Sequence, residues 1–163
     1  MKPQSESEMM HRMAAYCSVA ERCLYDVRKK MQAAGLSTEA MEGIVDRLIK
    51  EKFIDEKRFA RCFVNDKLRF NHWGRIRINY ELGKKNIPPA ICREALEGID
   101  EATYNDILYA LLKEKKKTLR GKNEQEVFLK LLRFASGRGF ENRETIPCLR
   151  RLYKGHNHAD DPE

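Results

Sequence analysis

One local pattern occurs three times in this chain, around Gly35, Asn86 and Gly139, which lie 51 and 53 residues apart. Apolar residues stand eight and four positions before each of these residues, and one, ten and thirteen positions after it. Residues four apart share one face of a helix. Glycine and asparagine tolerate the left-handed conformation that ends a helix. The pattern therefore predicts a unit of helix, tight turn and helix that is used three times.

Repeats of this length are typical of helical units that stack side by side and share a core. The start of a further helix also recurs, because Ile54-Asp55-Glu56 with Phe59 reappears as Ile99-Asp100-Glu101 with Tyr104. Each unit thus gains a leading helix. We expect an all-α protein, an elongated right-handed-type stack of three tandem three-helix repeats with about nine helices. Apolar residues at 42% and charged residues at 35% favour such a stack over a compact globule.

The predicted boundaries follow from this repeat. They are a flexible N-terminus at residues 1–8, repeats at 9–54, 55–99 and 100–153, and a disordered tail at 154–163. The segment 75–80 alternates polar and apolar residues as a strand would, but Ile78, Leu82 and Asn86 keep the offsets of the helical copies, so we predict a helix. Trp73 is assigned to packing between units, with Gly74 allowing close approach. The alternative role for Trp73 is direct contact with a binding partner.

The net charge of +7 is concentrated in two blocks. Residues 56–88 hold nine basic and three acidic side chains, and residues 113–133 hold eight and three. Such blocks indicate an acidic or polyanionic partner, although solvation of helix faces explains many single residues equally well. The candidates for partner binding are Arg58, Arg61, Lys67, Arg69, Arg75, Arg77, Lys84, Lys85, Lys115, Lys116 and Lys117. The candidates for structural roles in the repeat are Gly35, Trp73, Gly74, Asn86 and Gly139.

Catalytic motifs are absent from the sequence: it has no GxxxxGK[ST], GxGxxG or HExxH. His156 and His158 alone make a poor metal site. We therefore expect neither an enzyme nor a cofactor, metal or small-molecule substrate. The longest apolar run, 107–112, is far shorter than the roughly 20 residues of a membrane span, and the first ten residues lack a secretory apolar segment. Five cysteines without CxxC spacing indicate buried thiols in a reducing compartment. The expected location is cytoplasmic.

Several of these elements together resemble the central signature of the RecX regulators. They are Ile54-Asp55-Glu56-Lys57-Arg58-Phe59-Ala60, Trp73-Gly74-Arg75-Ile76-Arg77, Glu81-Leu82, Lys85-Asn86-Ile87 and, near the end, Arg138-Gly139-Phe140. The resemblance covers roughly residues 9–153. It departs from the family pattern at Asn86, which stands where glycine is usual, at Cys23, which replaces a Ser-like cap, and at Gly83, which is expected to interrupt the middle helix.

The resemblance implies a monomeric modulator that lies along the RecA recombinase filament and lowers its ATPase, strand-exchange and co-protease activities, with weak DNA contact at most. On this basis, reversing Arg75, Arg77, Lys84 and Lys85 to Glu is expected to weaken inhibition while leaving helix content intact. A stand-alone helical DNA-binding module is the alternative, because the turn at 34–38 resembles a helix-turn-helix corner. An inert helical scaffold is a third interpretation.

Overall fold

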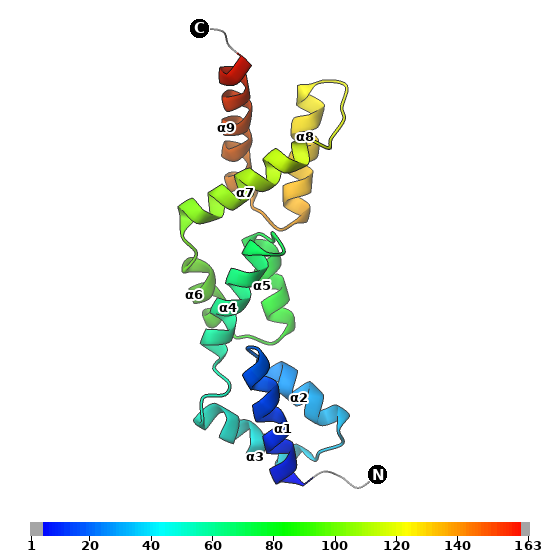
Figure 1. Ribbon diagram of the computed structural model, residues 1–163, viewed down its shortest axis with the longest axis vertical. Helices are drawn as coiled ribbons and strands as arrows, with labels where there is room; N and C mark the ends of the chain where they lie inside the picture. Colours follow the sequence, from blue (N-terminus) through cyan, green and yellow to red (C-terminus); the bar gives the residue numbers. More distant parts are fainter. Residues whose placement is uncertain (1–4, 161–163) are drawn as a thin grey trace. The chain divides into compact units, whose positions relative to one another are not determined.

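The computed structural model describes the backbone of residues 5–160 and the side chains of residues 5–154. This part of the chain is all-helical, with nine α-helices and no strand (Figure 1). The prediction of an all-α protein is confirmed, including the helix at 75–80. The helices are α1 (Glu6–Val19), α2 (Leu24–Ala33), α3 (Thr38–Lys50), α4 (Glu56–Arg69), α5 (Arg75–Lys84), α6 (Pro89–Glu97), α7 (Glu101–Lys116), α8 (Glu124–Gly137) and α9 (Asn142–Asp160).

Both ends of the described chain are more helical than the sequence predicts. The Ser5 hydroxyl accepts a hydrogen bond from the Glu8 amide at 3.2 Å, and acidic residues in the first turn favour the helix start. Residues 6–8 form the first turn of α1, where the sequence predicts part of a flexible segment at 1–8, and the bounds of that segment stay a prediction. The backbone of residues 154–160 continues α9, where the sequence suggests a disordered tail, and that tail stays a prediction. The first proline after these residues is Pro162, and a single glycine costs a helix only about 1 kcal/mol.

Carboxylate caps begin both α4 and α7, at the recurring Asp-Glu pair. The Asp55 side chain accepts from the Arg58 amide at 3.0 Å, and the Asp100 side chain accepts from the Thr103 amide at 3.0 Å. The aromatic residue four positions after each cap is buried, with Phe59 5% exposed and Tyr104 fully covered. The recurring helix start that the sequence suggests is thus present in the structure.

The three turns of the repeated pattern have the same backbone geometry. Gly35, Asn86 and Gly139 have φ of 81°, 59° and 92°. The next residue in each copy donates its amide to a carbonyl five residues earlier: Leu36 to Met31, Ile87 to Leu82 and Phe140 to Ala135, at 3.3, 3.2 and 3.0 Å. This bond is the one that closes a helix end around a left-handed residue. The prediction of left-handed caps is confirmed. Gly83 does not interrupt α5, which continues to Lys84.

The left-handed conformation of Asn86 leads to a first prediction about stability. Asn86→Ala is expected to lower the free energy of unfolding by about 1 kcal/mol, because alanine lacks the local hydrogen bonding that lets asparagine adopt this conformation. Asn86→Gly is the control and is expected to be neutral or slightly stabilising, because glycine adopts positive φ without a steric cost. Urea unfolding followed by circular dichroism measures both; equal stability of the two variants would contradict the role of Asn86.

The chain divides into two compact units. One comprises residues up to Phe63 together with Leu82–Ala95, and the other comprises Val64–Glu81 together with the chain from Leu96 onward. The division into three repeats at 54 and 99 stays a prediction. In the first unit, α1, α2 and α3 enclose a methionine-rich core, and in the second, α7, α8 and α9 pack on one another. The fully covered core residues of the second unit include Ile78, Tyr104, Leu108, Leu112, Leu131, Ala135 and Leu149.

Candidate functional site

The first turn of α5 makes close backbone contacts within the second unit. The amide of Gly74 donates to the carbonyl of Arg138 at 2.8 Å, and the amide of Ile76 donates to the carbonyl of Gly139 at 3.0 Å. A Cβ atom on Gly74 would lie 2.4 Å from backbone atoms of Gly139 and Phe140. The beginning of α5 therefore rests directly on the turn between α8 and α9. Gly74 serves close approach, as its sequence context predicts.

A further amide of this first turn is bound by a side chain. The Arg75 amide donates to the Tyr104 hydroxyl at 3.1 Å, and that hydroxyl in turn donates to the Glu141 carboxylate. These bonds satisfy amides that a helix start otherwise leaves without partners. We call the contact between the start of α5, Tyr104 and the α8–α9 turn the joint.

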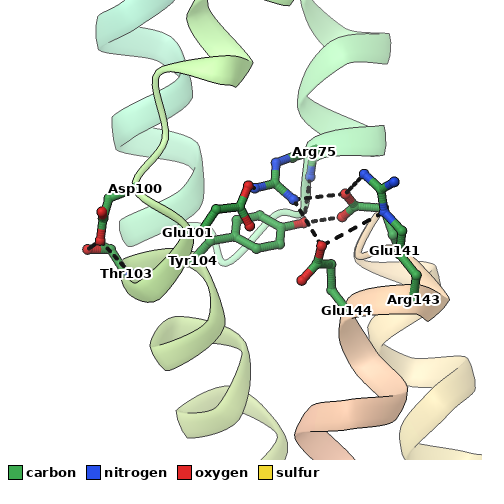
Figure 2. Close-up of polar contacts among 8 residues, drawn as sticks. All are labelled: Arg75, Asp100, Glu101, Thr103, Tyr104, Glu141, Arg143 and Glu144. Atoms are coloured by element: carbon green, nitrogen blue, oxygen red, sulfur yellow. Dashed lines mark hydrogen bonds and ion pairs between the residues drawn. The ribbon is translucent and has the colours of Figure 1, made fainter.

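The Arg75 guanidinium lies between the carboxylates of Glu101 and Glu141 at the joint (Figure 2). It lies 3.9 Å from the centre of the Tyr104 ring, donates to Glu141 at 2.9 Å and to Glu101 at 2.7 Å, and is 3.8 Å from Glu144. The side chains of Arg75 and Glu141 are each only 14% exposed. A half-buried pair of this kind fixes geometry, because removing one partner leaves the other charge uncompensated.

The pKa values of the joint follow from this geometry. Burial by itself raises the pKa of Glu141, but the hydrogen bonds from Tyr104 and Arg75 outweigh it, so the pKa is lowered. Burial by itself lowers the pKa of Arg75, but hydrogen bonds with Glu141 and Glu101 raise it overall. Burial, followed by the bond to Glu141, raises the pKa of Tyr104. The arginine and the carboxylate therefore stay charged, and the phenol stays neutral, across the neutral pH range.

Arg75 thus has a different role from the one that its charge suggests. The sequence places it among the candidates for partner binding because it lies in a basic block that suggests an acidic or polyanionic partner. That reason fails for Arg75, and also for two residues of the first unit. Arg58 donates to Glu21 at 2.7 Å and to backbone carbonyls, and Lys85 donates to Asp26 at 2.7 Å. The fourfold charge reversal would therefore disturb the fold as well as the surface, which corrects the expectation that helix content stays intact.

The other basic candidates fall into two groups. Some lie over aromatic rings: Lys67 and Arg77 over Trp73 at 5.0 and 4.3 Å, Lys115 over Phe134 at 4.9 Å, and Lys116 over Tyr153 at 4.1 Å. The rest are exposed, namely Arg61, Arg69, Lys84 and Lys117, of which Lys117 pairs with Glu114 at 2.9 Å. Trp73 is half-buried, and the cations over its ring support its assignment to packing.

A cavity of about 500 Å³ lies in the first unit. Its lining includes Tyr25, Arg28, Glu56 and Lys85. Within the described side chains, the buried Oε2 atom of Glu56 has no hydrogen-bond partner, and burial raises the pKa of this carboxyl group. Lys85 belongs to the first unit, and the joint belongs to the second.

The thiol pKa values and the grouping of potential metal ligands bear on whether a reactive thiol or a metal site is present. Burial raises the pKa of Cys17, Cys92 and Cys148, and raises that of Cys23 to about 12, so none of these four thiols is an activated nucleophile. Among the residues whose side chains are described, no three His, Cys, Asp or Glu residues are grouped as a metal site would need. His156 and His158 lie outside those side chains.

Sequence reasoning missed two features of this region. The partners of Arg75 were not predicted. Tyr104 occupies the repeat position of Phe59, and a tyrosine hydroxyl at such a buried position needs a hydrogen-bond partner, which could have pointed to this contact. The exposed apolar residues of α5, Ile76 and Tyr80, were also missed. Alternation of polar and apolar residues in a helical segment places apolar side chains on two opposite sides of the helix. The alternation over residues 75–80 could therefore have predicted exposed apolar residues.

Comparison with known proteins identifies the family. The chain is 30% identical over 152 residues to the protein named Regulatory protein RecX of Prosthecochloris aestuarii (strain DSM 271 / SK 413), an alignment that covers 93% of this chain and 98% of the relative. The chain belongs to the RecX family. A second RecX protein, from Clostridium tetani (strain Massachusetts / E88), is 32% identical over 135 residues, which is 81% of this chain and 60% of that relative.

Two further findings agree with RecX membership. A family model described as RecX, second three-helix domain, matches residues 55–96. The crystal structure of RecX from Lactobacillus salivarius has a TM-score of 0.81 at 18% identity, and covers 90% of this chain and 96% of that one. At this identity the likeness shows a common fold. The residues by which the sequence resembles RecX regulators include Asp55, which caps α4, and Gly74 and Arg75, which form the joint.

None of the described helices of this RecX-family chain combines the length and the apolar character that crossing a bilayer requires. Its relatives are named regulatory proteins.

Proposed function

We propose that this protein binds the RecA recombinase filament and lowers its ATPase, recombinase and co-protease activities, and so acts in DNA repair, recombination and the SOS response. The observation that carries the proposal is the match, at 30% identity, to nearly the whole length of a protein named Regulatory protein RecX. RecX regulators are the family that the sequence motifs resemble, and RecA is the target which that resemblance implies. Such a target also implies a cytoplasmic location.

The structure supports a role in binding rather than in chemistry. The buried thiols are not activated, and the most elaborate polar cluster, the joint, holds helices together. A chain of helical units can contact more than one subunit of a filament, so its binding can bridge subunits or obstruct an incoming one. Exposed cations such as Arg61 and Arg69 suit a surface close to filament-bound DNA.

Titration of RecA-dependent ATP hydrolysis on single-stranded DNA tests the proposal. We expect the rate to fall as the protein is added and to level off below the rate of RecA alone. Adding the protein before or after filament assembly separates a block of growth from disassembly. An unchanged rate in both orders, at concentrations where the protein is folded, would contradict the proposed function.

The DNA-binding alternative is tested in the same assay series by omitting RecA. Binding of the protein to single- and double-stranded DNA is measured at several salt concentrations, since phosphate contacts weaken steeply with salt. The proposed function predicts weak binding that vanishes at moderate salt. Tight or sequence-specific binding without RecA, together with unchanged ATPase, would favour the stand-alone module.

A further inference from the structure

Helix α5 presents apolar side chains to solvent as well as to the core. Ile78 is fully buried, whereas Ile76 is 59% exposed and Tyr80 is 65% exposed. Ile76 and Tyr80 are four residues apart, so they are neighbours on the surface of the helix, and the exposed Asn79 lies beside them. We call Ile76, Asn79 and Tyr80 the outer face of α5.

Large apolar side chains are unevenly distributed over the surface. Six are exposed among the described residues, and three of these, Phe70, Ile76 and Tyr80, fall within eleven consecutive residues. Single exposed apolar residues are ordinary, but a concentration of them marks an interaction site. The start of α5 is also held firmly by the joint, so this face is presented by a rigid element rather than by a loop.

The repeat shows that the fold does not require an aromatic ring at position 80, whereas the position of Ile76 is apolar or aromatic in every copy, as Tyr25, Ile76 and Leu129. Counting back six positions from Gly35, Asn86 and Gly139 gives Lys29, Tyr80 and Arg133. Two of the three copies therefore carry a cation where the middle copy carries an aromatic ring. Lys29 and Arg133 are exposed, as Tyr80 is. The apolar character of Tyr80 is thus specific to the middle copy and is not explained by helix packing.

The charge around this face indicates the chemistry of its occupant. Besides Arg75, whose charge is compensated by Glu141 and Glu101, residues 64–81 carry three basic and two acidic side chains, and Arg77 lies three positions before Tyr80 on the same helix. Two copies of this chain that met face to face here would bring like charges together. A nucleic acid held through its phosphates would place cations at the centre of the contact, but the centre holds isoleucine, asparagine and tyrosine. An apolar centre with a basic surround fits a protein surface that is apolar in the middle and acidic at its rim.

We propose that the outer face of α5 is the surface by which this protein contacts an apolar, acid-rimmed patch on a RecA subunit of the filament. This inference rests on the proposed function, and it adds which residues make the contact. Tyr80 is its aromatic anchor and Ile76 its aliphatic neighbour. Tyrosine suits an anchor because it combines a large contact area with few rotatable bonds.

The test uses substitutions that the repeat itself supplies. Tyr80→Arg places in the middle copy the residue that the third copy already carries, so the fold is expected to accept it. Ile76→Ala removes the aliphatic neighbour. The matched control is Leu129→Ala, because Leu129 occupies the position of Ile76 in the third copy and is 46% exposed. Circular dichroism and urea unfolding establish that all three variants are folded.

Affinity is measured for RecA filaments on single-stranded DNA, and separately for the same DNA without RecA. Tyr80→Arg is expected to weaken filament binding about tenfold or more, and Ile76→Ala about fivefold, while Leu129→Ala changes it less than about twofold. On DNA alone, Tyr80→Arg is expected to bind as well as the wild-type chain or better, because it adds a positive charge.

Each other outcome overturns the inference in a recognisable way. If Tyr80→Arg binds the filament as tightly as the wild-type chain does, the contact lies elsewhere although the proposed function stands. If the variant loses affinity equally for the filament and for bare DNA, Tyr80 stacks on bases and the occupant is nucleic acid. If the wild-type chain itself does not bind the filament, the proposed function fails and the assignment of this face to RecA falls with it.

Discussion

Replacing Gly74 with alanine is expected to lower the free energy of unfolding by about 3 kcal/mol or more. The added Cβ atom would lie 2.4 Å from the carbonyl carbon and oxygen of Gly139 and from the amide nitrogen of Phe140. These are backbone atoms, so no side chain can turn aside to make room. The start of α5 would have to move away from the α8–α9 turn, and the bonds from Gly74 to Arg138 and from Ile76 to Gly139 would lengthen or break.

Gly83→Ala is the matched control, because Gly83 lies in the same helix with open space around its Cα and without a positive φ. Alanine there is expected to be neutral or to stabilise the protein by up to about 1 kcal/mol, since it restricts the unfolded chain and favours the helix. Thermal and urea unfolding of the two variants can be compared directly. Similar stability of Gly74→Ala and Gly83→Ala would show that the close backbone contact at the joint is absent in solution.

Arg75→Met is expected to cost about 3 kcal/mol, the second large effect. Methionine keeps much of the aliphatic length but leaves the Glu141 carboxylate, which is 14% exposed, without its guanidinium partner. Glu101 and Glu144 lose the same cation, and only the largely exposed Arg143 remains near Glu141 and Glu144. Arg28→Met is the control: the Arg28–Glu42 pair is 39% and 45% exposed, so its loss is expected to cost less than about 1 kcal/mol.

The same variant changes the dependence of stability on pH. The folded pKa of Glu141 lies below its ordinary value of 4.5, so its contribution to stability is present above that value and is lost as the pH falls through the lowered folded pKa. Without Arg75 the folded pKa rises, because burial still disfavours the charged carboxylate. Acid unfolding of Arg75→Met is therefore expected to begin at a higher pH than that of the wild-type chain. Identical acid-unfolding curves would contradict the pairing of Arg75 with Glu141.

Much of the fold could be predicted from the sequence because its determinants are local. The left-handed turns at Gly35, Asn86 and Gly139, and the caps at Asp55 and Asp100, each depend on a few consecutive residues. The C-terminal end of the chain has no such local determinant in the sequence. Polar composition suggested disorder near residue 154, whereas the backbone keeps its helical conformation to Asp160, in a stretch with no proline to stop it.

The candidate site was predicted less well than the fold, because it depends on which distant residues meet. Arg75 is held in the fold by Glu141, which lies 66 residues later in the chain, and Arg58 is held by Glu21, which lies 37 residues earlier. A list of basic residues cannot separate those that hold the fold together from those that face a partner. Only long-range pairing makes that distinction, and a single sequence without aligned relatives does not reveal it.

The position of Trp73 gives the joint an optical reporter. It is the single tryptophan of the chain, it directly precedes Gly74, and the cations of Lys67 and Arg77 lie over its ring. Its emission wavelength and quenching therefore depend on whether the start of α5 is seated against the α8–α9 turn. Fluorescence excited selectively in the indole can thus follow the seating of this helix, without any label, while the protein meets its target.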